Sequence, residues 1–127
     1  MSERQEQAAL FEWIEWQKKV WLELDLVYAI PNGQMRKGQP KEPGMMPGIP
    51  DIFVAYPSRG YHGGYIELKV PGGRISKAQG KWMQALKHVG YYVAVCWGWE
   101  EARDAISWYL GKIEIGGENG RTSNSNI

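Results

Sequence analysis

Residues 47–70 read PGIPDIFVAYPSRGYHGGYIELKV and contain two apolar runs separated by a turn. The runs IFVAY (52–56) and YIELKV (65–70) are rich in β-branched and aromatic residues, which is typical of β-strands. The glycine-rich stretch PSRGYHGG between them indicates a hairpin. This segment therefore predicts two adjacent strands at the centre of the fold.

Charged residues lie immediately before one strand of the predicted hairpin and inside the other. Asp51 stands immediately before the first strand, and Glu67 and Lys69 lie inside the second. Because side chains alternate across a strand, Glu67 and Lys69 share one face, and the intervening Leu68 points to the other. Placing these charges beside one another on a partly enclosed surface costs solvation free energy, so their presence suggests a functional role.

The segments on either side of the hairpin predict an α/β fold with a central mixed sheet flanked by helices. Residues 3–22 have the apolar spacing of a helix that begins after Ser2, and Ser76 is the expected N-cap of a second helix, 77–89. The expected remaining elements are a strand at LVYAI (26–30), a strand covered on both faces at YYVAVCW (91–97), a helix at 99–110 and a short edge strand at KIEI (112–115). One domain, 1–115, followed by a disordered polar tail, 116–127, accounts for the length.

Asp51, Glu67 and Lys69 together suit phosphodiester hydrolysis. Two carboxylates from adjacent strands can bind a hard divalent cation, with the carbonyl of Leu68 as a further oxygen ligand. Such a cation polarises a phosphoryl oxygen and lowers the pKa of an attacking water, while a nearby ammonium stabilises the transition state. Simpler roles remain open at this stage: Asp51 can cap a turn, and Glu67 and Lys69 can form a solvated pair on an exposed face.

The motif Pro50-Asp51, followed after a gap by Glu67-Leu68-Lys69, resembles the PD-(D/E)XK signature of restriction-enzyme-like nucleases. The surrounding sequence, residues 47–102, is similar to the VRR-NUC family, as are YAIPNG (28–33) and the N-terminal helix with Glu3 and Gln7. The resemblance implies a restriction-endonuclease-like fold, Mg²⁺ or Mn²⁺ as cofactor, and branched DNA such as Holliday junctions as substrate of a homodimer. It is nearest to the small stand-alone phage and bacterial members.

The same resemblance suggests residue roles. It implies that Asp51 and Glu67 are metal ligands, that Lys69 is the catalytic lysine, and that Gln79 contacts the scissile phosphate or the water network. Gln79 lies one turn before Met83 on the predicted second helix, so it is expected to point inward, and it is also compatible with a plain first-turn helix position. Glu3 is the expected N-terminal acidic residue of the site, and Glu6, one turn further along, is the alternative.

Positive charge is concentrated in the middle of the chain. Residues 31–90 carry nine basic and three acidic side chains, although the whole chain has a net charge of only +1. This asymmetry favours a polyanionic partner on one face, and an ordinary mixed surface is the alternative. The expected phosphate contacts are Arg36, Lys37, Lys41, Arg74 and Lys77.

The composition excludes several other classes of protein. The single cysteine, Cys96, cannot form an internal disulfide, and no Cys/His cluster suggests zinc. No apolar run approaches the roughly 20 residues of a membrane span, and the polar start MSERQEQ does not resemble a signal peptide. A cytoplasmic protein is therefore expected, and the resemblance to the VRR-NUC family implies a bacterial or phage origin.

Two other functions compete with a structure-selective DNA endonuclease. A catalytically inert DNA-binding module could keep the same fold, although it has no physical need for the charges at positions 51, 67 and 69. A sequence-specific restriction enzyme is disfavoured because the chain shows no helix-turn-helix, zinc finger or long insertion that could read bases.

Overall fold

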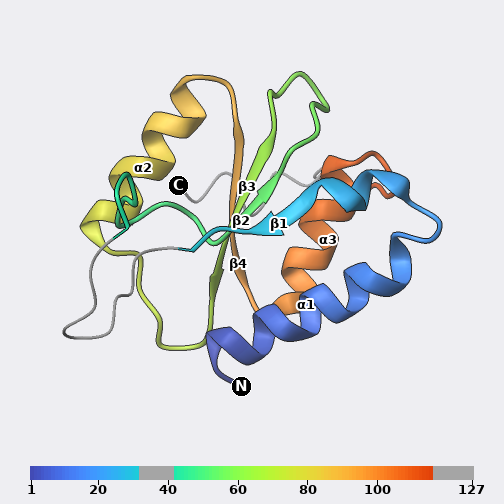
Figure 1. The fold of residues 1–127 in the computed structure, drawn as a ribbon, viewed down its shortest axis with the longest axis horizontal. Coiled ribbons are helices and arrows are strands. Elements are labelled where there is room, and N and C mark those ends of the chain that lie inside the picture. Colours follow the sequence, from blue (N-terminus) through green and yellow to red (C-terminus); the bar gives the residue numbers. More distant parts are fainter. Residues whose placement is uncertain (32–41, 116–127) are drawn as a thin grey trace.

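The computed structural model describes residues 1–31 and 42–115 of the chain. Within these residues, four strands form one mixed sheet in the order β1-β2-β3-β4 (Figure 1). They are β1 (Val27–Ala29), β2 (Ile52–Val54), β3 (Gly64–Lys69) and β4 (Tyr92–Trp97). The first two neighbouring pairs are antiparallel, which confirms the predicted hairpin, and β3 and β4 are parallel. The predicted α/β class with a central mixed sheet is confirmed.

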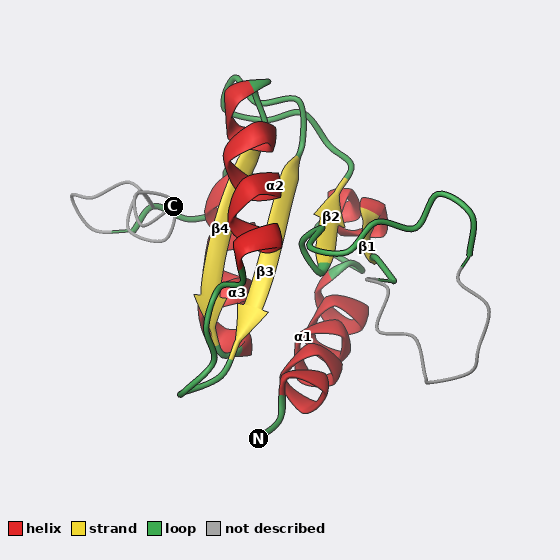
Figure 2. Cartoon of the chain, turned by 90° about the vertical axis from the view of Figure 1, so that its left-hand side faces the viewer, coloured by secondary structure: helices red, strands yellow, loops and turns green. Residues whose placement is uncertain are grey.

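Helices cover both faces of this sheet. Helices α1 (Glu3–Gln17) and α3 (Trp99–Tyr109) lie on one face, and α2 (Lys77–His88) lies on the other (Figures 1 and 2). Since β3 and β4 are parallel neighbours, the chain must cross over between them, and α2 forms this connection. A short 3-10 helix, η1 (Leu22–Leu26), leads from α1 into β1.

The alternation in β3 separates the core from the charged face. Ile66 and Leu68 are buried in one large core cluster together with Leu10 and Ile14 of α1. Glu67 and Lys69 point to the opposite face, where Met83 of α2 packs on β4 in a second, smaller cluster. Side chains of β4 belong alternately to the two clusters, so the prediction that this strand is covered on both faces is confirmed.

Two predicted segments differ from the structure. The first helix ends at Gln17, not at residue 22, because Trp21 folds back to place its ring edge-on to Trp13 at 5.9 Å. A continuous helix would separate these two residues by about 12 Å along its axis. The KIEI segment (112–115) forms no strand; Ile113 and Ile115 instead pack against the core as irregular chain. The predicted tail, 116–127, lies outside the described residues.

The loop before β2 is fixed to α2 at Gly48. This residue has a φ of +92°, and a Cβ atom there would lie 2.8 Å from the carbonyl carbon of Ala78. Ala78 belongs to the first turn of α2, and Asp51 follows three residues after Gly48. The absence of a side chain at Gly48 therefore lets the loop that carries Asp51 lie directly against the start of α2.

We predict that Gly48→Ala destabilises the fold by about 1–3 kcal/mol more than Gly44→Ala, as expected for overpacking against backbone. Gly44 is a matched control because it also has a positive φ, +83°, but a Cβ atom there would meet nothing within 4 Å. Urea unfolding of both variants measures the difference. Equal losses of stability would show that the contact with Ala78 is unimportant.

Candidate active site

The hairpin register brings Asp51 and Glu67 together. Ile52 pairs with Ile66 in the antiparallel ladder, so the next position along each strand places Asp51 opposite Glu67. The Oδ2 atom of Asp51 accepts a hydrogen bond from the backbone N–H of Leu68 at 2.8 Å, which fixes this carboxylate against β3. Both acidic residues are buried, Glu67 almost completely, at 1% exposed.

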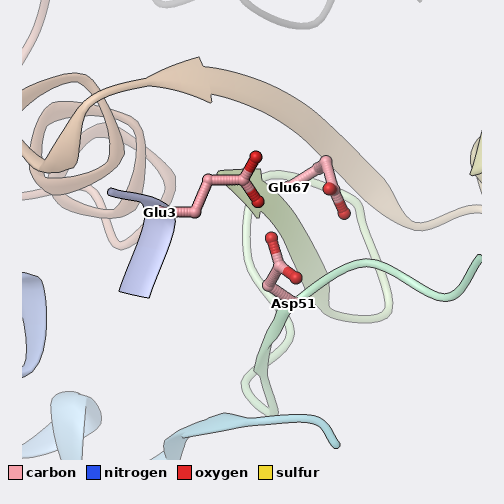
Figure 3. Close-up of side chains that lie close together, drawn as sticks. All are labelled: Glu3, Asp51 and Glu67. Carbon is pink, nitrogen blue, oxygen red and sulfur yellow. The ribbon is translucent and has the colours of Figure 1, made fainter. Parts of the chain in front are cut away.

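Glu3 adds a third carboxylate from the first turn of α1. One oxygen from each of Glu3, Asp51 and Glu67 lies within 4.8 Å of the others (Figure 3). Glu3 is exposed, whereas the other two are buried, so the group has one open side. Three segments far apart in the sequence thus bring three acidic side chains into one place.

Lys69 and Gln79 form the other side of this group. The Nζ atom of Lys69 lies 3.5 Å from Oε2 of Glu67 and donates a hydrogen bond to Oε1 of Gln79 at 3.1 Å. The amide nitrogen of Gln79 donates to the same Glu67 oxygen at 3.0 Å. Gln79 therefore links the lysine to the glutamate, and its position on the inner side of α2 agrees with the inward orientation predicted from the sequence.

The first turn of α2 fixes the position of Gln79. The Ser76 hydroxyl accepts a hydrogen bond from the Gln79 backbone N–H at 3.1 Å, and the Gln79 side chain accepts one from the Ser76 backbone N–H at 2.8 Å. This is a capping box, which confirms Ser76 as the N-cap of the helix. Gln79 thus takes part in capping α2, and the same side chain reaches into the acidic site.

Burial and mutual repulsion disfavour the charged forms of the two central carboxylates. Burial, and next the charge of Asp51, raise the pKa of Glu67 from its ordinary value of 4.5 to about 8, although Lys69 opposes this shift. Burial also raises the pKa of Asp51, against the effect of the Leu68 N–H, and the Glu3 carboxylate raises it further. The Oε1 atom of Glu67 is buried with no hydrogen-bond partner. The site is therefore short of positive charge and of a partner for one oxygen.

Glu6 lies at a different place from Glu3. It is 8% exposed, and its Oε1 atom accepts a hydrogen bond from the backbone N–H of Trp99 at 3.3 Å. Trp99 is the first residue of α3, whose N-cap, Gly98, makes no side-chain capping hydrogen bond. A carboxylate is also favoured there by the helix dipole. The structure thus brings Glu3, rather than Glu6, to Asp51 and Glu67.

The positions of the predicted phosphate contacts are only partly described. Both described residues are exposed: Arg74 lies between the end of β3 and α2, and Lys77 is the first residue of α2. Arg36, Lys37 and Lys41 lie outside the described residues.

A cavity at α1 is lined by residues that neighbour the site in the sequence. It has a volume of about 310 Å³ and is lined by Arg4, Gln7, Ala8, Phe11 and Ala29. Arg4 directly follows Glu3, and the backbone N–H of Ile30, next to Ala29, donates to the Asp51 carbonyl at 2.7 Å. The sequence alone does not predict that Arg4 lines this cavity, because Arg4 is a single arginine in an acidic N-terminal segment.

Comparison with known proteins identifies the class of domain. A search of solved structures finds a chain described as a VRR_NUC domain protein, with a TM-score of 0.70 and 22% sequence identity, which covers 92% of this chain and 94% of that one. This similarity shows that the two chains share a fold. No curated protein matches the chain.

The family is established by the sequence itself. The family model for the VRR-NUC domain matches residues 1–99, which include Glu3, Asp51, Glu67, Lys69 and Gln79. The chain therefore belongs to the VRR-NUC family. No helix in residues 1–31 and 42–115 is long and apolar enough to cross a membrane.

The raised pKa of Glu67 predicts a pH dependence of stability in the absence of divalent cations. Because the folded protein holds this proton more tightly than the unfolded chain, the free energy of unfolding should fall as the pH rises from about 4.5 to about 8. Glu67→Gln, which cannot ionise, should show a shallower fall over this range. Urea unfolding in EDTA at several pH values measures both slopes, and identical slopes would contradict the prediction.

Proposed function

We propose that this chain is a metal-dependent endonuclease that hydrolyses phosphodiester bonds in DNA. The observation that carries the proposal is the meeting of Glu3, Asp51 and Glu67, with ligand atoms within 4.8 Å, beside the ammonium of Lys69. A structural role alone does not explain this cluster, because buried like charges destabilise a fold. Membership of a nuclease-type family supports the same conclusion.

The acidic group fits Mg²⁺ or Mn²⁺. These ions prefer oxygen ligands, and the buried Oε1 of Glu67, which accepts no hydrogen bond from the described residues, offers one. Asp51 and Glu67 would hold the ion, the carbonyl of Leu68 would be a further ligand, and Glu3 would contribute from the open side. When bound, the ion supplies a Lewis acid that polarises a phosphoryl oxygen and lowers the pKa of water.

Lys69 and Gln79 perform the remaining tasks in this proposal. The Lys69 ammonium favours hydroxide over water near Glu67 and stabilises negative charge that develops on the phosphoryl group. Gln79 holds Lys69 and Glu67 in place through its two hydrogen bonds, so both groups are oriented before substrate arrives. Its amide also lies close enough to this pair to contact the scissile phosphate or the attacking water.

The proposed substrate is branched DNA, such as a Holliday junction, cut by a homodimer. Each chain has one such acidic group among its described residues, so two symmetric cuts need two copies related by a two-fold axis. Arg74 and Lys77, exposed beside the start of α2, are the proposed phosphate contacts within the described residues, together with Arg4 at the α1 cavity. Arg36, Lys37 and Lys41 are proposed as further contacts from the basic central segment of the sequence.

We predict metal-dependent cutting that requires the acidic group. Labelled four-way junction, flap, single-stranded and linear duplex DNA are incubated with Mg²⁺, Mn²⁺ or EDTA. Lys69→Ala and Asp51→Asn should slow cutting by at least about 100-fold, the usual effect of removing one charge-stabilising group. Folded variants that cut as fast as the wild type would refute the assigned roles.

The role of Glu3 is tested in the same assay, with Glu12 as the control position. Glu3→Gln should reduce the cutting rate, whereas Glu12→Gln, an exposed glutamate on the same helix, should leave it unchanged. Lack of cutting by the wild type on every substrate in both metals, together with retained DNA binding, would favour an inert DNA-binding module.

The homodimer is tested separately. Light scattering with a four-way junction in EDTA should give the mass of two chains on one junction. A mass that corresponds to one chain per junction at saturating protein would contradict the dimer while leaving the nuclease assignment intact.

A further inference from the structure

Four aromatic rings form a continuous row across the sheet. Phe53 of β2 lies opposite Tyr28 of β1 and Tyr65 of β3 in the strand register, with ring centroids at 5.8 Å and 4.6 Å. Tyr91, which precedes β4, extends the row, with its ring 5.4 Å from that of Tyr65. We refer to Tyr28, Phe53, Tyr65 and Tyr91 as the aromatic row.

The aromatic row remains accessible to solvent. Helix α2 covers this face of the sheet mainly over β4, where Met83 packs, and lies away from β1 (Figures 1 and 2). Tyr28 is 52% exposed, and the other three rings are half-buried. Neighbouring rings of the row meet edge-on or tilted, at interplanar angles of 75°, 39° and 70°, and Tyr65 and Tyr91 also pack against the smaller core cluster. Because soluble proteins expose few contiguous apolar patches, the accessible parts of these rings mark a candidate binding surface.

The row adjoins the acidic group on the same face of the sheet. Phe53 is two residues after Asp51, and Tyr65 is two residues before Glu67, so each pair of side chains points to one side. Two residues of strand correspond to about 7 Å. A DNA strand whose phosphate lies at the acidic group can therefore place an adjacent nucleotide over the aromatic row.

We propose that the aromatic row binds unpaired nucleobases of the DNA substrate by stacking, and so favours DNA with single-stranded segments or open junction centres over intact duplex. An unpaired base exposes its flat π-face, whereas bases within a duplex are stacked on each other and show only their edges. This inference rests on the proposed nuclease function, because it assigns the row to the substrate of the same site.

Another aromatic groove in the described chain is less suited to nucleic acid. It is a cavity of about 280 Å³ lined by Trp13, Trp16 and Trp99 together with the carboxylate-bearing Glu12. This groove lies between α1 and α3, on the opposite face of the sheet from Glu67. No residue of the aromatic row is acidic, and the row shares its face with the acidic group.

The test compares binding of single-stranded and duplex DNA in EDTA, where no metal-dependent cutting occurs. Fluorescence anisotropy measures the affinity of a labelled oligothymidine and of a blunt duplex of equal length. Tyr28→Leu keeps an apolar side chain but removes the ring, so it should weaken single-strand binding roughly 5- to 100-fold, as expected for one lost stacking contact. Duplex binding should change less than about 2-fold, since phosphate contacts dominate it.

Two variants control for the ring and for its location. Tyr28→Phe keeps the ring and should bind single strands as the wild type does. Trp16→Leu removes another exposed aromatic side chain, at the end of α1, and should have no effect on either DNA. Unchanged single-strand binding by Tyr28→Leu, or an equal loss for both DNAs, would overturn the proposal. A loss that accompanies dissociation of a dimer in light scattering would overturn it in favour of a second copy of the chain on this surface.

Photo-cross-linking provides a measurement that does not depend on the variants. An oligonucleotide with 5-iododeoxyuridine, irradiated with the wild-type protein, should form adducts that mass spectrometry locates at residues of the aromatic row. Adducts confined to other aromatic residues would refute the proposal. Because neither assay needs cleavage, stacking without nuclease activity and nuclease activity without stacking are distinguishable results.

Discussion

Asp51 accepts a hydrogen bond from the Leu68 backbone at 2.8 Å, and the geometry of the acidic site depends on this contact. The donor belongs to the residue between Glu67 and Lys69, so one bond sets Asp51 relative to both charged side chains of β3. Asp51 itself sits at the end of a loop that Gly48 holds against the start of α2. The same turn of α2 carries Gln79, whose side chain binds Glu67 and Lys69. The contact of Gly48 with α2 and the hydrogen bonds of Gln79 to β3 therefore act together, and they leave the side chains of the site little conformational freedom.

The cost of this arrangement is electrostatic. Three carboxylates meet near one ammonium, and the buried Glu67 has its pKa raised to about 8 by lost solvation and by the charge of Asp51. The hydrophobic core on the opposite face of β3 compensates, because Ile66 and Leu68 are almost completely buried there. The alternation of a strand therefore lets one segment stabilise the fold with one face and hold a destabilising site with the other. A cation that binds only the folded chain would offset part of this electrostatic destabilisation.

The sequence predicted the fold class, the hairpin and the inward position of Gln79 from local patterns. These features depend on alternation, capping and turn residues, all of which act over a few positions. It favoured Glu3 over Glu6 only through the family resemblance, because the position of Glu6 depends on where α3 begins relative to α1, more than ninety residues later in the chain. Trp99 needs a partner for its backbone N–H, and Glu6 is the residue within reach. The early end of α1 likewise depends on a tertiary contact, that of Trp21 with Trp13.

The aromatic row shows a similar limit. Tyr28, Phe53 and Tyr65 each occupy one position of a short strand, and an isolated aromatic residue in a strand ordinarily indicates core packing. Only the register of three strands aligns them, and only the placement of α2 over β4 leaves them accessible.

Helix α2 covers only part of this sheet face, and this partial cover also affects the acidic group. The helix that shields Glu67 and Lys69 from water stops short of β1, so the acidic group lies at the boundary between a covered and an open part of the same sheet face. A substrate can reach such a boundary from the open side while the groups that act on it remain desolvated, and electrostatic interactions are stronger where water is excluded.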